Sequence, residues 1–290
     1  MKVWAKALLL LASVSGVALA QTQTQLSALE RSKLELPAIA LPAVELKGQL
    51  TQGSLLLGKT APGSKVFFNN IELPISADGR FVFGVGRDAP LKHQLKVQIN
   101  QQQLVKELVF SQRKYDVQYV TGVAQKYVTP PKDVSERISK DNQRVRKVRE
   151  TVSGLAYIFV TPIMPAQGRI SGVYGSQRVF NGEPRNPHYG LDIAAPTGAK
   201  VIAPFSGKVL LAEDLYYSGL TLIVDHGFGI NSTFMHLSKF DVAVGDTVQQ
   251  GQKIAEVGAS GRVTGPHLDW RINWQQERLD PALLPGLIIP

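Results

Sequence analysis

The stretch from His188 to Val209 reads HYGLDIAAPTGAKVIAPFSGKV and decides the fold of the C-terminal half. Glycines and prolines divide it into short apolar and β-branched runs, and none is long enough for a helix. The strand-like runs in this stretch and after it are Lys200–Ile202, Gly207–Ala212, Leu220–Asp225, Asn231–His236, Lys253–Val257 and His267–Asn273. Runs of this length bounded by turn residues are typical of strands. Residues 155–290 are therefore predicted to form a nearly all-β domain.

The same region gathers most of the histidines. Four of the five histidines lie within 80 residues: His188, His226, His236 and His267. His188 and Asp192 are spaced i, i+4, with Gly190 between them, and His267 and Asp269 are spaced i, i+2. On extended strands each pair shares one face. Two such pairs can converge on one ion, and zinc favours three His or Asp ligands with a fourth position open to water.

Five segments between residues 165 and 284 together resemble the lysostaphin-like zinc metallopeptidases, also called LytM-type peptidoglycan endopeptidases. They are GRISGVYG, HYGLDIAAPTGAKVIAPFSGKV, IVDHGFGINSTFMHLS, VGDTVQQGQKIAEVGASG and TGPHLDWRINW. The resemblance implies a β domain with a zinc groove. It makes His188 and Asp192 zinc ligands, through HxxxD, and makes His236 and His267 active-site histidines. The third ligand position falls on Asp269, where the family usually has His.

The resemblance also implies the activity, which is hydrolysis of the peptide cross-links of peptidoglycan. Zinc would polarise the scissile carbonyl and supply hydroxide, while His236 and His267 bind the oxyanion and shuttle protons. A carboxylate at Asp269 should make the zinc a weaker Lewis acid. The alternative is therefore a catalytically inactive peptidoglycan-binding module that activates other cell-wall hydrolases, because some members of this family have lost zinc ligands.

A third possibility starts from two segments that look like the hairpin repeat of biotinyl or lipoyl carrier domains. These are Val244–Val248 and Gly251–Ile254. Such a carrier displays a lysine at a tight hairpin tip between its two halves. No tip of that kind is present, so we interpret the similarity as shared β architecture.

Other polar and aromatic residues near these motifs have simpler interpretations. His226 is predicted to be a turn residue that closes the strand before it. Trp270 and Trp274 are expected to pack in the sheet, with a groove-lining role as the alternative. Tyr216 and Tyr217 lie in a predicted loop, where contact with substrate is the less favoured interpretation.

The N-terminus has the features of an export signal. Lys2 and Lys6 flank the start of a short apolar run, and the segment ends on Ala18-Leu19-Ala20, so residues 1–20 are predicted to be a signal peptide cleaved after Ala20. An uncleaved anchor is the alternative. The chain contains no cysteine, which excludes disulfides and lipid attachment at a cysteine. The predicted location is the periplasm or cell envelope.

Between the signal and the C-terminal domain the composition changes twice. Residues 21–44 are predicted to be a tether. Residues 45–112 contain short alternating runs separated by turn residues, including Ala77-Asp78-Gly79, and are predicted to form a small β-sandwich accessory domain. Residues 113–154 are predicted to be a linker containing an exposed helix over Lys132–Thr151, because that segment is charged and has apolar residues at helical intervals.

Charge is distributed unevenly along the chain of 290 residues. The formal net charge is +9, and an excess of +8 lies in residues 21–154. For an exported protein this favours anionic envelope polymers or membrane surfaces over nucleic acid as partners. A solvated surface kept soluble by its charge is the alternative. The expected partners are peptidoglycan and, through the N-terminal domain, an envelope protein.

Overall fold

The computed structural model describes residues 42–121, 131–184 and 186–289. The predicted signal segment, residues 1–20, lies outside this part of the chain, as does nearly all of the predicted tether. Within the described residues no helix is both long and apolar enough to cross a bilayer. The chain is mainly β, as the sequence predicts.

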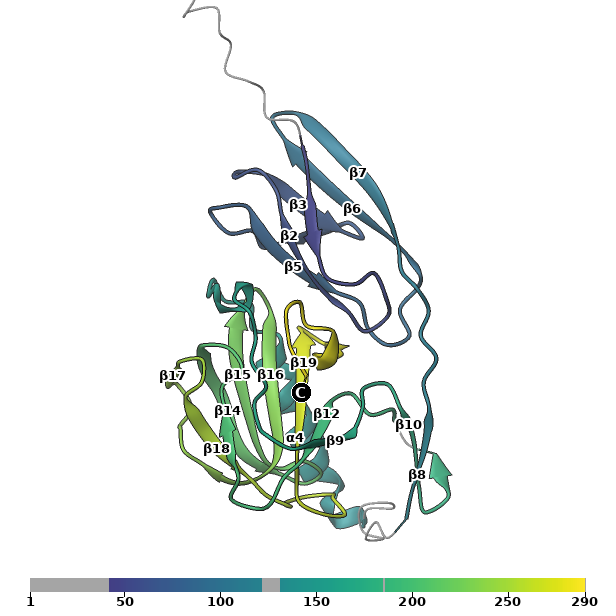
Figure 1. Cartoon of the computed structure of the whole chain (residues 1–290), viewed down its shortest axis with the longest axis vertical. Helices are drawn as coiled ribbons and strands as arrows, with labels where there is room; N and C mark the ends of the chain where they lie inside the picture. The colour runs from purple at the N-terminus through teal and green to yellow at the C-terminus, as the bar shows by residue number, and fades with distance from the viewer. Residues whose placement is uncertain (1–41, 122–130, 185, 290) are drawn as a thin grey trace, which may run out of the picture. The chain divides into compact units, whose positions relative to one another are not determined.

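Residues 45–109 form a small sandwich of two antiparallel sheets (Figure 1). The first has the order β1-β2-β5 and the second the order β4-β3-β6-β7. Their bounds are β1 Glu45–Lys47, β2 Leu55–Lys59, β3 Lys65–Phe68, β4 Ile71–Leu73, β5 Arg80–Gly84, β6 Lys92–Ile99 and β7 Gln102–Val109. Alternate residues such as Leu95 and Val97 are buried, which is the period-two pattern expected of strands with one face on a core. The predicted turn at residues 77–79 is present, and Gly79 adopts a positive φ of 84° there.

The segment after the sandwich contains β8 (Val117–Val120), the short 3₁₀ helix η1 (Lys132–Val134) and α4 (Ser135–Arg149). The predicted helix is therefore present, but the prediction that it is exposed is wrong in part. Asp141 and Arg149 on α4 are each only 5% exposed. The carboxylate of Asp141 accepts a hydrogen bond from the backbone N–H of Tyr216 at 2.8 Å, which fixes α4 against the C-terminal domain.

The C-terminal domain is built on a ten-stranded sheet whose main path has the order β17-β14-β15-β16-β19-β12-β9. The strands of this path are β9 Arg169–Gly172, β12 Leu191–Ala194, β14 Gly207–Leu215, β15 Gly219–Gly227, β16 Ile230–Phe240, β17 Thr247–Val248 and β19 His267–Trp274. Three further strands branch from it: β13 Lys200–Ile202, β18 Lys253–Val257 and β20 Glu277–Leu279. The shorter elements nearby are η2 Tyr157–Phe159, β10 Gln177–Phe180, β11 Glu183–Pro184 and η3 Pro281–Leu283. Strand β10 pairs in parallel with β8 of the linker.

The register of the central strands sets up the site. Strands β12 and β19 are antiparallel neighbours, and their register places Asp192 directly opposite Asp269. On the other side of β19, Met235 of β16 is the partner of Asp269. Like charges directly opposite one another destabilise a sheet unless something compensates them. This pairing therefore needs a positive charge at its centre.

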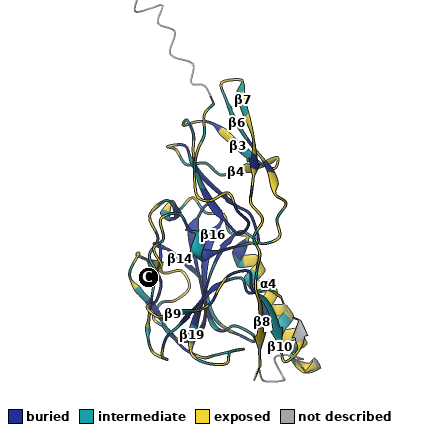
Figure 2. Cartoon of the chain, turned by 45° about the vertical axis from the view of Figure 1, so that its right-hand side comes forward, coloured by how far each residue is buried: buried dark blue, intermediate teal, exposed yellow. Residues whose placement is uncertain are grey.

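The buried apolar residues of the described chain form one cluster, and Figure 2 shows where the buried residues lie along the strands. Phe81 of the sandwich and Trp270 of the C-terminal sheet are among its largest fully buried side chains. Leu279 of β20 packs over Gly84 so closely that a Cβ there would collide with it. Arg113 also pairs with the buried carboxylate of Asp280 at 2.8 Å. The sandwich strands and the end of the chain therefore share packing.

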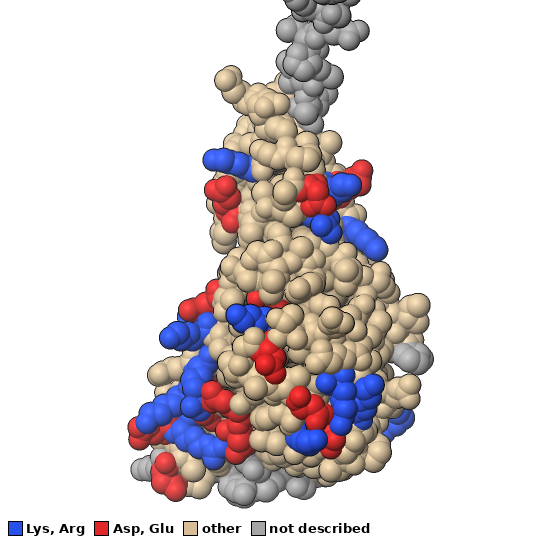
Figure 3. Space-filling model, turned by 90° about the vertical axis from the view of Figure 1, so that its left-hand side faces the viewer, with Lys and Arg blue, Asp and Glu red and all other residues tan. Residues whose placement is uncertain are grey.

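Acidic and basic side chains are interleaved on the face drawn in Figure 3. Exposed side chains of the described residues also form ion pairs, such as Lys140 with Glu136 at 2.6 Å. Exposed pairs of this kind contribute little to stability. On that face the positive excess of the sequence does not gather into a single basic patch.

Candidate metal centre

Three side chains that the sequence selects as metal ligands come together in the C-terminal sheet. One ligand atom from each of His188, Asp192 and Asp269 can be chosen so that all three lie within 4.8 Å of one another. All three residues are buried. Nε2 of His188 is 3.1 Å from Oδ1 of Asp192, and Nδ1 of His188 is 3.9 Å from Oδ2 of Asp269. One imidazole and two carboxylates thus surround a single point.

The local structure that brings them together differs from the expected one in one respect. The sequence predicts His188 and Asp192 on one strand, but β12 begins only at Leu191. His188 instead lies in the preceding loop, where its backbone N–H donates to the carbonyl of Ser176 at 2.8 Å. Gly190 permits the close approach of Asp269, because a Cβ at position 190 would collide with Oδ1 of that residue.

The ring nitrogens of His188 are the clearest sign that the cluster is suited to an ion. Both are buried and neither makes a hydrogen bond, and the same is true of Oδ1 of Asp192. Buried polar atoms are nearly always hydrogen-bonded, so an unpartnered group at this position needs a reason. A cation bound to one ring nitrogen of His188 and to Oδ1 of Asp192 would supply it for those two atoms.

Two arginines that the sequence analysis did not select also contact the cluster. Arg271 pairs with both oxygens of Asp269, through Nε to Oδ1 at 2.9 Å and through Nη2 to Oδ2 at 2.6 Å. Arg178 donates from Nη2 to Oδ2 of Asp192 at 2.6 Å. Two guanidinium groups therefore balance the two carboxylates that the strand register places opposite one another.

These contacts control the protonation of the carboxyl groups. Burial acts to raise the pKa of Asp269, but the charges of Arg271 and His188 overcome it and hold that pKa well below its usual range. Burial and the charge of Asp269 likewise oppose ionisation of Asp192, yet His188 and Arg178 keep its pKa below the ordinary value. Both side chains are therefore carboxylates, the form that binds a metal.

His236 and His267 lie beside the cluster, with ring centroids 4.9 Å apart. Nδ1 of His236 is 2.9 Å from the carbonyl oxygen of Ser260, and Nδ1 of His267 is 2.9 Å from that of Gly265. A carbonyl can only accept, so each Nδ1 carries a proton, and Nε2 is the nitrogen that carries the lone pair in the neutral ring. Nε2 of His267 is 3.8 Å from Oδ1 of Asp192. The structure thus brings all five side chains together.

His236 occupies an unusual backbone conformation. Its φ is 63°, in the left-handed region, and its N–H donates to the carbonyl of Ser218 at 2.9 Å. A residue with a side chain rarely adopts this conformation, and such residues concentrate at functional sites. Burial lowers the pKa of His236 to about 4, so the imidazole is neutral at neutral pH.

A cavity of about 180 Å³ opens beside His236 and Asp269. Its wall includes Tyr217, for which contact with substrate was the less favoured interpretation, and residues of α4 such as Ile138 and Val145. The helix predicted to be a linker therefore forms part of the candidate site. The spacing of its apolar residues predicts the helix, but the sequence does not predict that these residues cover a cavity.

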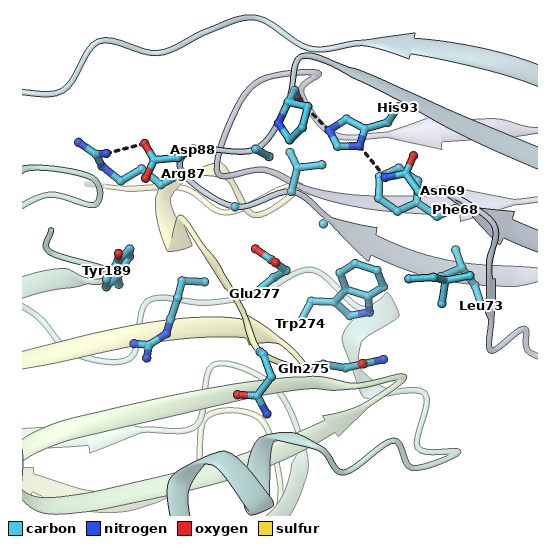
Figure 4. Close-up of a pocket in the computed structure, with 18 of the residues that line it drawn as sticks. Phe68, Asn69, Leu73, Arg87, Asp88, His93, Tyr189, Trp274, Gln275 and Glu277 are labelled. Carbon is cyan, nitrogen blue, oxygen red and sulfur yellow. Dashed lines mark hydrogen bonds and ion pairs between the residues drawn. The ribbon is translucent and has the colours of Figure 1, made fainter. Parts of the chain in front are cut away.

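A second cavity of about 820 Å³ lies apart from the candidate ligands. Figure 4 shows Trp274 and Glu277 near its middle, with Phe68 and His93 on the sandwich side. The centroids of the Phe68 and Trp274 rings are 6.2 Å apart in an edge-on arrangement. Trp274 therefore lines a cavity, which agrees with the alternative interpretation of a groove-lining role. None of the five site residues lines that cavity.

Two other side chains near the motifs have structural roles. Trp270 is fully buried, as expected for packing in the sheet. His226 lies within β15 and is fully buried, so the prediction of a turn residue is wrong. Its ring nitrogens lie 2.8 Å from the carbonyl oxygen of Ser206 and 2.8 Å from Oγ of Ser232. It is a hydrogen-bonded core histidine.

Comparisons with known proteins agree with this geometry. The profile of peptidase family M23 matches residues 186–281. Two similar proteins of Vibrio cholerae are the peptidoglycan DD-endopeptidase ShyB, 42% identical over 30% of this chain, and the peptidoglycan DD-endopeptidase ShyA, 31% identical over 49% of this chain. The murein hydrolase activator EnvC of Escherichia coli is 37% identical over 40% of this chain.

The extent of these similarities differs between sequence and structure. The aligned regions span 20% of ShyB, 32% of ShyA and 27% of EnvC, so this chain matches a third or less of each relative. A crystal structure from Pseudomonas aeruginosa, described as an M23 peptidase, is 26% identical with a TM-score of 0.64. That match covers 82% of this chain and 96% of the other, so it extends beyond the segment that carries the motifs.

Proposed function

Because residues 186–281 form a domain of peptidase family M23, we propose that this chain is an exported zinc metalloendopeptidase that hydrolyses peptide cross-links of peptidoglycan. The names of the similar Vibrio proteins support the substrate class. The signal-like N-terminus supports export to the periplasm or cell envelope. The sandwich at residues 45–112 would act as an accessory domain that positions the enzyme and meets an envelope protein partner.

One observation carries the proposal: His188 is buried among two ionised carboxylates and has two ring nitrogens without hydrogen-bond partners. An imidazole and two carboxylates form a donor set that zinc accepts. His188, Asp192 and Asp269 would hold the ion. When bound, zinc supplies Lewis-acid polarisation of a carbonyl and lowers the pKa of water towards neutrality.

The protein's own contribution to the reaction comes from His236 and His267. Each imidazole is fixed by its Nδ1–H bond to a backbone carbonyl, which directs the lone pair of Nε2 to accept a proton. The neutral state of His236 suits it to accept a proton during attack and to return it to the leaving amine. Once protonated, the same Nε2–H can donate to a developing oxyanion.

A specific observation favours a second candidate, a catalytically inactive peptidoglycan-binding module that activates other hydrolases. Arg271 takes both oxygens of Asp269, and Arg178 takes one oxygen of Asp192, so the carboxylates are already neutralised without a metal. The similarity to EnvC, which is named as a murein hydrolase activator, supports this alternative. The unpartnered nitrogens of His188 weigh against it.

Digestion of purified peptidoglycan distinguishes the two functions. The chain without residues 1–20 is loaded with zinc, its metal content is measured by elemental analysis, and the sacculus fragments are identified by mass spectrometry. The enzyme requires about one zinc per chain and release of peptide fragments that a chelator prevents. Binding to sacculi with no fragment release and no retained zinc would establish the inactive module. The sequence of the fragments then identifies the bond that is cut.

A further inference from the structure

The cavity of about 180 Å³ beside His236 has an unusual excess of positive charge. Five arginines and two aspartates line it. The arginines are Arg149, Arg178, Arg262, Arg271 and Arg278, and the aspartates are Asp141 and Asp269. Five guanidinium groups against two carboxylates leave an excess of three positive charges in a partly enclosed space. Charges removed from water are stable only when they are paired.

The carboxylates of the cavity are already committed. Asp269 binds Arg271, and Asp141 pairs with Arg144 on the same helix at 2.5 Å. Arg178 pairs with Asp192 through Nη2, although its own Nε has no hydrogen-bond partner. Among the described residues, no carboxylate lies within ion-pair distance of Arg149 or of Arg278. The charges of these two arginines are therefore not balanced by a carboxylate inside the part of the chain that the structure describes.

Arg149 is the strongest indication of a ligand. It is only 5% exposed, and its buried Nε donates to no acceptor. Its position in the last turn of α4 is favourable for a cation, because the helix dipole is negative there. That interaction does not use the Nε–H of Arg149. An acceptor atom of a bound molecule would receive a hydrogen bond from it.

The environment also disfavours the positive charges that it gathers. Burial, followed by the charges of Arg278 and Arg271, lowers the pKa of Arg149 well below its usual value. Burial and the charge of Arg271 lower the pKa of Arg278 to about 10. A bound anion would offset both effects. The cavity thus lacks the negative charge that would balance Arg149 and Arg278.

The rest of the lining indicates what kind of anion fits. Ile138, Val145, Leu215 and Met235 supply apolar surface, and Tyr217 supplies an aromatic ring. A volume of 180 Å³ holds roughly six waters. It therefore suits a small anionic group on a short aliphatic chain better than a large anion. The side chain of His236 forms part of the same wall. A group bound here therefore lies next to the candidate reaction centre.

We propose that this cavity, through Arg149 and Arg278, binds a free carboxylate of the peptide substrate and so selects which peptides enter the site. The inference rests on the proposed function, because it takes the peptide strands of peptidoglycan as the ligand. The carboxylate comes either from the end of the peptide or from an acidic residue within it. Bidentate recognition of carboxylate is the chemistry for which guanidinium is best suited.

The test compares three probes by calorimetry on the unaltered mature chain, with metal removed by a chelator so that no probe is cut. The probe is N-acetyl-L-Ala-γ-D-Glu-L-Lys-D-Ala, which has a carboxylate on D-Glu and one at its C-terminus. Each of two analogues replaces one carboxylate by a carboxamide. We expect one analogue to bind at least ~10-fold more weakly, which identifies the source of the carboxylate. Equal binding of all three probes overturns the inference.

Variants of the helix then assign the contact. Arg149→Gln should bind the free acid more weakly than the unaltered chain does, by the same factor of at least ~10. Its affinity for the analogue whose carboxamide weakens binding should be unchanged. Arg149→Lys should lose less affinity for the free acid. Arg146→Gln is the matched control, since Arg146 lies on the same helix with its side chain 74% exposed. Equal losses for acid and carboxamide would mean that Arg149 only supports the fold. The comparison of probes on the unaltered chain does not depend on whether these variants fold.

Two further measurements separate this inference from the proposed function. Inorganic phosphate is tested as a competitor of the free-acid peptide. If phosphate displaces the peptide at the same concentration as the unlabelled peptide does, the cavity is a general anion site and the inference is overturned. Hydrolysis of sacculi without any discrimination among the probes leaves the enzyme standing and removes the carboxylate site. Discrimination among the probes without hydrolysis by the zinc-loaded chain removes the enzyme and leaves the carboxylate site.

Discussion

Arg271 and Asp269 lie two residues apart on β19 and form a bidentate ion pair, and Asp269 is at the same time the cross-strand partner of Asp192. A zinc ion that binds Asp269 must therefore share the carboxylate with a guanidinium. The positive charge of Arg271 also repels a divalent cation. We expect this pair to weaken zinc binding relative to a site in which the carboxylate is free.

Changes at Asp269 test whether it is a metal ligand. Asp269→Ala should abolish stoichiometric zinc, and Asp269→Asn should weaken zinc binding because it removes the charge. Asp269→His should restore a neutral nitrogen donor and raise the affinity if the strand admits the ring. Zinc content after dialysis against a chelator series measures each effect. An unchanged zinc content in Asp269→Ala would show that Asp269 serves only as the partner of Arg271.

Removing the guanidinium should have opposite effects on the two states of the protein. Arg271→Gln leaves Asp269 and Asp192 facing each other without that cation, so the metal-free chain should lose about 3 kcal/mol of stability. Zinc should recover part of this loss, and it should raise the melting temperature of the variant more than that of the unaltered chain. Thermal melts with and without zinc measure the difference. An equal zinc-induced shift in both proteins contradicts competition between Arg271 and the metal.

His236→Ala and His267→Ala should each reduce hydrolysis by about 10²- to 10⁴-fold while sparing bound zinc, because neither residue is in the ligand cluster. His188→Ala serves as the comparison, since it should lose both zinc and activity. Fragment release from sacculi and zinc content are measured on the same preparations. If the His236 and His267 variants lose zinc as completely as His188→Ala does, these histidines are ligands instead.

His226 should make stability depend on pH. Burial lowers its pKa to about 4, whereas an unfolded histidine has a pKa of about 6.5. The contribution of the neutral His226 to the free energy of unfolding is therefore complete above pH 6.5. About 3 kcal/mol of that free energy is lost as the pH falls from 6.5 to 4. His226→Gln should flatten that part of the stability curve, measured by urea denaturation at each pH. Ser232→Ala keeps the buried imidazole and should retain the slope.

Gly190→Ala tests the space that admits Asp269. A Cβ at this position would collide with the Asp269 carboxylate and the carbonyl oxygen of Trp270. We expect a loss of about 1–3 kcal/mol and weaker zinc binding. Gly265→Ala is the matched control, since no atom lies within 4 Å of the Cβ position there, and it should change stability by no more than about 0.5 kcal/mol. Equal effects of the two substitutions would argue against a specific contact with Asp269.

The sequence predicts the β architecture from local pattern, and it groups the five site residues through the resemblance to the lysostaphin-like metallopeptidases. It does not predict how charges are paired. The spacing of Asp269 and Arg271 does place both on one strand face, so that contact had a visible signal. Arg178 had none, since it comes from β10, which pairs with a strand of the linker.

Burial was harder to predict than secondary structure. Helix α4 was expected from its composition, but its mean polarity gave no sign that Asp141 and Arg149 are buried. Which face of a charged helix is covered depends on the surface that receives it, here the turn that begins at Tyr216. That surface forms only when β14 and β15 are assembled.

The left-handed backbone of His236 carries a consequence for engineering this chain. A φ of 63° is a conformation that glycine and asparagine tolerate better than histidine. A library screened for heat resistance alone should therefore enrich Gly or Asn at this position and discard the imidazole. Selection for robustness and selection for turnover would then favour different residues at the same site, so directed evolution of a durable variant must screen for both properties in every round.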